Sequence, residues 1–169
     1  MNRSRIADLS EIVSSIAIVV TLIYLTVEIE QNTDAIRTQT AQSILDAGQS
    51  ELTAFMEHPS IALSIPNTGP LTAEQNVMLD AFLANAMRSR EFAWLQYENN
   101  TIDEAVWLGE VAVLGVYLDS TRIRIWWDKL GRHYLGSEFV QFVDQMIEEN
   151  PATDKIWTAT LDWSSQLEN

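Results

Sequence analysis

The stretch IVSSIAIVVTLIYLTV, residues 12–27, contains no charged side chain, although the chain as a whole is strongly acidic. A helix needs about 20 apolar residues to cross the core of a bilayer. Counted from Leu9, residues 9–27 span roughly 28 Å at about 1.5 Å per residue. The sequence therefore predicts one transmembrane helix at 9–27, lying in the lipid bilayer after an N-terminal flank of residues 1–8.

Three other kinds of segment share this composition. A cleaved signal peptide ends in small neutral residues, whereas TVEIEQ follows here. A helix lying on the membrane surface has a polar face rich in Lys or Arg, which this stretch lacks. A buried helix of a soluble protein remains an alternative, since short apolar runs occur there. Ile, Val and Leu occupy every side of this helix, however, and we favour lipid as the surroundings of such a segment.

The charges on the two sides of the span predict its orientation. Arg3 and Arg5 precede it, whereas Glu28, Glu30 and Asp34 follow it. Positive charges are retained on the cytoplasmic side of a membrane. We therefore expect a single-pass protein of the bacterial inner membrane, with a cytoplasmic N-terminus and the remaining chain in the periplasm.

The composition limits the classes of function. The chain has 24 acidic and 10 basic residues and a net charge of −14, which opposes binding to nucleic acid phosphates. It has no cysteine, so disulfides, thiolate metal sites and cysteine nucleophiles are excluded. Few glycines and no alternating strand pattern favour an all-α fold. We expect an acidic helical domain at 28–150, and a tail at 151–169 that either docks as a last helix or orders against a partner.

Start and stop signals divide the domain into a compact bundle of about five helices. The transmembrane helix is expected to continue to His58, because Pro59 ends it. Thr72 and Gln75 have the spacing of a capping box. The expected segments are a loop at 59–70 and helices at 73–98, at 103–118, from Ser120 or Thr121 to Gly136, and from a Ser137 cap to Pro151.

Helical spacing also predicts which side chains of the domain face inward. The expected core residues are Met78, Phe82, Leu83, Met87, Trp94, Tyr97, Val106, Trp107, Val113, Leu114, Tyr117, Ile123, Trp127, Leu130, Tyr134, Phe139, Phe142, Val143, Met146 and Ile147.

Small and polar side chains recur along one side of the predicted span in an alternating spacing of four and three residues. Small residues allow close approach of helices in lipid, and hydroxyls can form hydrogen bonds across the contact. This side is a candidate oligomer seam or, in a larger ring of helices, a pore lining; such residues are also common in membrane helices without any role. We call it the polar seam: Ser10, Ser14, Ala17, Thr21, Tyr24 and Glu28.

Basic residues are concentrated near residue 130 of this acidic domain. Arg124, Asp128 and Arg132 follow at steps of four, as in an ordinary salt-bridged helix face. Trp126 and Trp127 lie either both in the core or with one facing outward on a binding surface. The candidate surface site for an anion or a lipid headgroup comprises Arg122, Trp126, Lys129 and His133.

The remaining titratable residues suggest structure rather than chemistry. Glu91 interrupts an apolar helix and is expected to pair with an arginine of a neighbouring helix. His58 and His133 are the only histidines, and neither has a carboxylate at metal-ligand spacing. We therefore predict no catalytic residue, no metal site and no cofactor.

Several segments resemble a group of small bacterial membrane proteins to which no reaction is assigned. The segments are LSEIVSSIAIVVTLIYLTVEIEQNT near the N-terminus, EFAWLQY at 91–97, DEAVW at 103–107, RIWWDKL at 124–130 and SEFVQFVDQMI at 137–147. The resemblance implies one N-terminal transmembrane helix and a helical C-terminal domain, and it implies no catalytic residues.

These observations favour a protein without catalytic activity that acts by assembly. Its partners are expected to be further copies of itself or other membrane proteins, as a homo-oligomer or an accessory subunit of a membrane complex. One alternative is a small oligomeric channel or membrane-permeabilising effector. The other is a domain that binds an anion or small ligand near Arg122.

Overall fold

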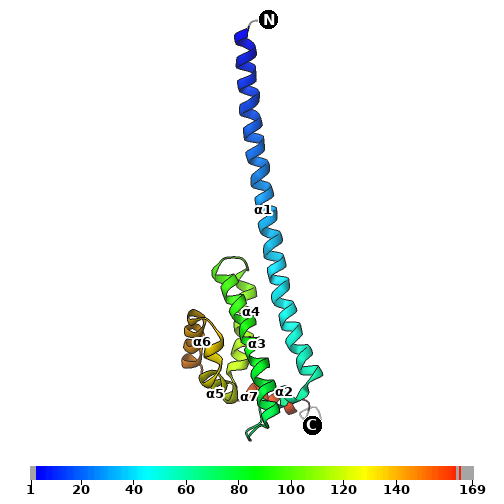
Figure 1. Ribbon diagram of the computed structural model, residues 1–169, viewed down its shortest axis with the longest axis vertical. Helices are drawn as coiled ribbons and strands as arrows, with labels where there is room; N and C mark the ends of the chain where they lie inside the picture. The colour runs from blue at the N-terminus through cyan, green and yellow to red at the C-terminus, as the bar shows by residue number, and fades with distance from the viewer. Residues whose placement is uncertain (1–2, 163, 165–169) are drawn as a thin grey trace. The chain divides into compact units, whose positions relative to one another are not determined.

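The computed structural model describes residues 3–162 and residue 164, with side chains from residue 11 onward. It divides into two compact units, residues 1–39 and 40–169. All regular structure in the described residues is helical, which confirms the all-α prediction. Figure 1 follows the chain from α1, which starts in the first unit, through the helices of the second.

Helix α1 (Arg3–Glu57) is long and apolar enough at its N-terminal end to cross a membrane, and it is the one described helix with this property. All side chains from residue 11 to residue 39 are exposed. The hydroxyls of this stretch donate to carbonyl oxygens of their own helix, Thr21 to Ala17 at 2.8 Å and Thr26 to Leu22 at 2.9 Å. These bonds suit lipid, where no water satisfies a hydroxyl.

The second unit is a bundle around α3 (Ala73–Glu98) and α4 (Glu104–Leu118), which lie side by side in Figure 1. The capping box at the start of α3 is confirmed: the Thr72 N–H donates to Gln75 Oε1 at 2.9 Å, and the Gln75 N–H donates to Thr72 Oγ1 at 3.2 Å. Asn100, with φ of 56°, ends α3 in the left-handed conformation that asparagine tolerates. After α4 the chain continues with α5 (Thr121–Lys129), the 3₁₀ helix η1 (Gly131–Tyr134) and α6 (Ser137–Glu149).

The core of the bundle matches most of the predicted inward positions. Val113 is an exception, because it is 38% exposed. Helix α4 is apolar on nearly all sides, so its periodicity does not define an inward face. The fully buried large side chains include Leu83, Met87, Leu114, Ile123, Trp127, Phe139 and Val143.

Three predicted local features are wrong. Residues 59–70 are not all loop, because Pro59 begins the short helix α2 (Pro59–Ser64), where a proline in the first turn loses no hydrogen bond. The helix that starts at Thr121 ends at Lys129, so Leu130 and Tyr134 leave its register and are exposed. Gly136, not Ser137, occupies the cap position of α6, and its N–H donates to Glu91 Oε1 at 2.5 Å.

The tail contains α7 (Lys155–Asp162), which docks on the bundle through Trp157. The Trp157 indole N–H donates to the Val116 carbonyl at 2.8 Å. Its ring lies 6.2 Å from that of Phe55 and 5.9 Å from that of Tyr117. Residues 163 and 165–169 of the predicted tail lie outside the described residues.

Two aspartates join the start of α7 to the start of α5. Asp119 accepts hydrogen bonds from the Thr153 hydroxyl at 2.7 Å and from the Ile156 N–H at 3.1 Å. In return, Asp154 accepts from the N–H and the hydroxyl of Thr121 at 2.8 and 2.6 Å. Burial raises the pKa of Asp119, but these hydrogen bonds outweigh it and hold that pKa below its usual value.

Candidate functional site

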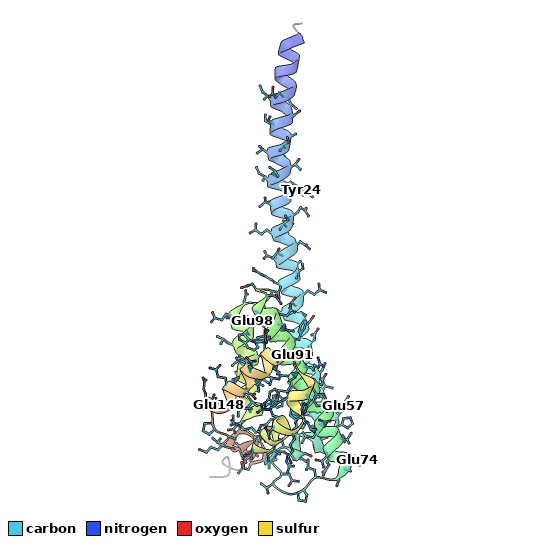
Figure 2. All side chains as sticks on the ribbon, turned by 60° about the vertical axis from the view of Figure 1, so that its left-hand side comes forward. Tyr24, Glu57, Glu74, Glu91, Glu98 and Glu148 are labelled. Atoms are coloured by element: carbon cyan, nitrogen blue, oxygen red, sulfur yellow. The ribbon has the colours of Figure 1, made fainter. Side chains whose placement is uncertain are left out.

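The structure places the polar seam on the exposed surface of α1. Tyr24 and Glu28 are hydrogen-bond partners along the helix. Figure 2 shows the side chains around Tyr24 projecting from the bare helix. The Thr21 hydroxyl uses its proton within α1, so its oxygen can only accept in a contact with another helix. Ser10 belongs to α1, but its side chain lies outside the described residues.

The four residues of the candidate surface site have different environments. Trp126 is buried and its indole N–H donates to Asp80 Oδ1 at 2.8 Å, while Trp127 is buried beside it. Arg122 donates to the backbone carbonyls of Asn67 and Gly69. Lys129 and His133 are exposed.

The neighbouring arginines also hold the bundle together. Arg124 donates to the Leu118 carbonyl at 2.6 Å and to the Ile147 carbonyl at 3.1 Å, joining the ends of α4 and α6. Arg132 lies 2.9 Å from Asp144 and 3.6 Å from Asp128. Much of the basic charge of this region is therefore used in structural contacts.

A hollow of about 470 Å³ lies beside Arg122. Its charged groups already have partners within the protein: Arg122 donates to the loop carbonyls, and both carboxylate oxygens of Asp154 accept from Thr121. Nothing in this pairing selects a class of ligand. The hollow is lined by Ile65, Pro66, Asn67, Thr68, Gly69, Pro70, Thr121, Arg122, Ile125, Asp154 and Thr158.

A buried charged cluster joins α1, α3 and α4 inside the second unit. Glu51 and Arg90 are 4% and 2% exposed and form an ion pair between Glu51 Oε1 and Arg90 Nη1. The buried Tyr117 hydroxyl donates to Glu51 Oε2 at 3.0 Å. The Arg90 guanidinium carbon lies 5.3 Å from the centre of the Tyr117 ring, within range of a cation–π interaction.

Glu110 is a second carboxylate in the same cluster. Its Oε2 lies 3.4 Å from Arg90 Nε, and its side chain is 16% exposed. Burial is the largest influence on Glu110 and raises its pKa; the charge of Arg90 lowers the pKa, and the charge of Glu51 raises it further. Burial and the charge of Glu51 also raise the pKa of Tyr117. The geometry therefore makes the ionised form of Glu110 less favourable than it is in water.

The prediction that Glu91 pairs with an arginine of a neighbouring helix is wrong. Glu91 pairs at 3.6 Å with Arg88 on its own helix, not with an arginine of a neighbouring helix. Arg90 makes the contacts between helices instead. An arginine inside an apolar helix indicates a buried ion pair, but the sequence does not indicate the partner of Arg90, because Glu51 is 39 residues away in the chain.

The outer face of α4 is an apolar surface that the sequence reasoning did not single out. Leu108 is 56% exposed and Val113 is 38% exposed. Ala105, Gly109 and Ala112 are also exposed, and no atom lies within 4 Å of where a Cβ on Gly109 would be. We call these five residues the α4 outer face. None of these five residues carries a charge.

Among the side chains that the structure describes, those of residues 11–162 and 164, no group of three or more His, Asp or Glu has the geometry of a metal site. No protein-family model, curated protein or solved structure matches the chain.

Proposed function

We propose that this chain is a membrane-anchored helical protein that acts by assembly, as a homo-oligomer or as an accessory subunit of a membrane complex. The α4 outer face is the observation that carries the proposal. Helix α4 is apolar on nearly all sides, and a helix of this kind is normally covered by other protein, but in the second unit this face is uncovered. Exposed apolar surfaces of this kind mark interaction sites in soluble domains.

The exposed apolar stretch of α1 supports the same proposal. It offers an anchor in the bilayer, and the polar seam offers a second contact along it. Anchoring confines all copies to one membrane in one orientation, which raises their effective concentration and makes small contact areas sufficient. The lipid bilayer is thus one partner, and another copy or another membrane protein is the second.

Native mass spectrometry of the full-length protein, extracted from its own membranes in mild detergent, tests assembly. We expect either one homo-oligomeric mass or co-extraction with other proteins in a fixed ratio. Replacing Ser14 and Thr21 together by leucine is expected to change the number of subunits in the complex. Leu108→Glu is expected to change it as well. Gln141→Glu adds the same charge as Leu108→Glu at an exposed position of α6 and should leave the number of subunits unchanged. A monomer without companions would contradict the proposal.

We also propose a cytoplasmic N-terminus and a periplasmic second unit in the bacterial inner membrane. The charges of Arg3 and Arg5 before the span support this orientation. Because the chain has no cysteine, single cysteines at Asn2 and Gln141 can each be tested with a membrane-impermeant maleimide in intact spheroplasts. Labelling at Gln141→Cys alone is expected, and labelling at Asn2→Cys alone would reverse the orientation.

A further inference from the structure

The buried charged cluster is unbalanced. Two carboxylates, Glu51 and Glu110, approach one guanidinium, that of Arg90. Each of the three charged groups comes from a different helix: α1, α3 or α4. When both carboxylates are ionised the cluster has a net negative charge, which is costly where little water reaches it.

The two carboxylates are not held equally. Arg90 Nη1 donates hydrogen bonds to Glu51 Oε1 and to the Ala86 carbonyl. Arg90 Nε, which faces Glu110, is buried and has no hydrogen-bond partner in the described residues. Glu110 therefore interacts with Arg90 by charge, without a hydrogen bond that would fix its position. It is also the more exposed of the two carboxylates, so it can exchange a proton with solvent.

The charge imbalance affects how α1 is held in the bundle. Glu51 is the buried carboxylate of α1, and it connects residues 40–57 to both α3 and α4. An ionised Glu110 repels Glu51 and competes with it for Arg90, whereas a neutral Glu110 does neither. We propose that Glu110 is a proton-controlled competitor of Glu51, and that losing its proton loosens the attachment of residues 40–57 of α1 to the bundle. This inference is independent of the proposed assembly.

The direction of the pH dependence follows from the shift of Glu110. Its pKa in the folded protein is raised above the ordinary 4.5. The stabilisation associated with neutral Glu110 is fully present below pH 4.5 and is lost as the pH rises through the raised value. The groups that face Glu110 are Arg90 from α3, Glu51 from α1 and the Tyr117 hydroxyl from its own helix. The attachment of α1 is therefore tighter in mild acid than at neutral pH.

Hydrogen exchange of the intact protein in detergent tests this inference. Amide protection of residues 40–57 is compared at about pH 5 and about pH 7.5, after correction for intrinsic exchange, and we expect lower protection at the higher pH. Glu110→Gln keeps the size of the side chain and cannot ionise. It should hold residues 40–57 at the high protection of the acid state at both pH values.

Two control variants separate this effect from other titrations. Glu104→Gln removes an exposed carboxylate from the first turn of the same helix and should leave the pH dependence intact. His58→Gln removes the imidazole that follows α1 and should also leave it intact. A pH-independent wild type, or a Glu110→Gln variant that still loses protection at the higher pH, would overturn the inference. So would a change spread equally over α3, α4 and α6.

Discussion

Replacing Arg90 by methionine is expected to destabilise the second unit by about 3–5 kcal/mol, because it leaves the buried Glu51 carboxylate without its cation. The methionine fills a similar space, so the loss measures the uncompensated charge more than a cavity. The Tyr117 hydroxyl still donates to Glu51, but one neutral donor does not replace a guanidinium. The measurement is urea unfolding in detergent followed by tryptophan fluorescence, since the five tryptophans of the described residues lie in the second unit.

The neighbouring arginine provides the matched control. The Arg88 side chain is 65% exposed and, among the described residues, it forms an ion pair only with Glu91 on its own helix, so Arg88→Met should change stability by less than about 0.5 kcal/mol. Adding Glu51→Gln to Arg90→Met removes the stranded charge and should recover part of the loss. Equal destabilisation by Arg88→Met and Arg90→Met would show that the buried ion pair has no special role.

Replacing Gly131 by alanine is expected to cost about 1–3 kcal/mol, the usual range for overpacking a core. A Cβ at this position would lie 2.7 Å from the Trp126 ring and 2.8 Å from the Trp127 ring. Trp127 is 1% exposed, and the indole N–H groups of both tryptophans donate to aspartates at 2.8 Å. Neither ring can move without disturbing those bonds.

The same substitution elsewhere should have the opposite sign. Gly115 lies inside α4 with no atom within 4 Å of its would-be Cβ. Alanine in a helix interior is more favourable than glycine by roughly 0.5–1 kcal/mol, so Gly115→Ala should raise the midpoint of unfolding. The comparison uses the same fluorescence assay. A Gly131→Ala variant as stable as Gly115→Ala would mean that the contact between Gly131 and the two rings is not tight.

Local signals predicted the helices well because they act within a few residues. The capping box at Thr72 and the stop at Pro59 each depend on neighbours along the chain, and both positions are confirmed. The error at Leu130 and Tyr134 has a different origin. Helical spacing placed Leu130 and Tyr134 on the same inward face as Ile123 and Trp127. The α-helix ends at Lys129, however, and Gly131 of η1 packs directly against two indole rings.

The charged cluster was beyond prediction for a physical reason. Its members come from three helices, and nothing in the spacing of one helix indicates which carboxylate reaches the arginine of another. The α4 outer face was predictable in principle, because apolar residues occupy nearly all sides of α4 and one side of such a helix can remain uncovered. The polar seam and the surface site around Arg122 remain predictions.

The hydrogen bonds of Asp119 and Asp154, which join the starts of α5 and α7, have a consequence for how the chain folds during synthesis. The first turn of α5 is completed by a residue that the ribosome adds more than 30 positions later. Until Asp154 has emerged, the N–H of Thr121 lacks this partner, and α7 cannot cover the rings of Phe55 and Tyr117. The bundle therefore cannot reach its final packing while synthesis proceeds through α6. The closing step therefore waits until Asp154 and α7 have left the ribosome, well after α1 has emerged.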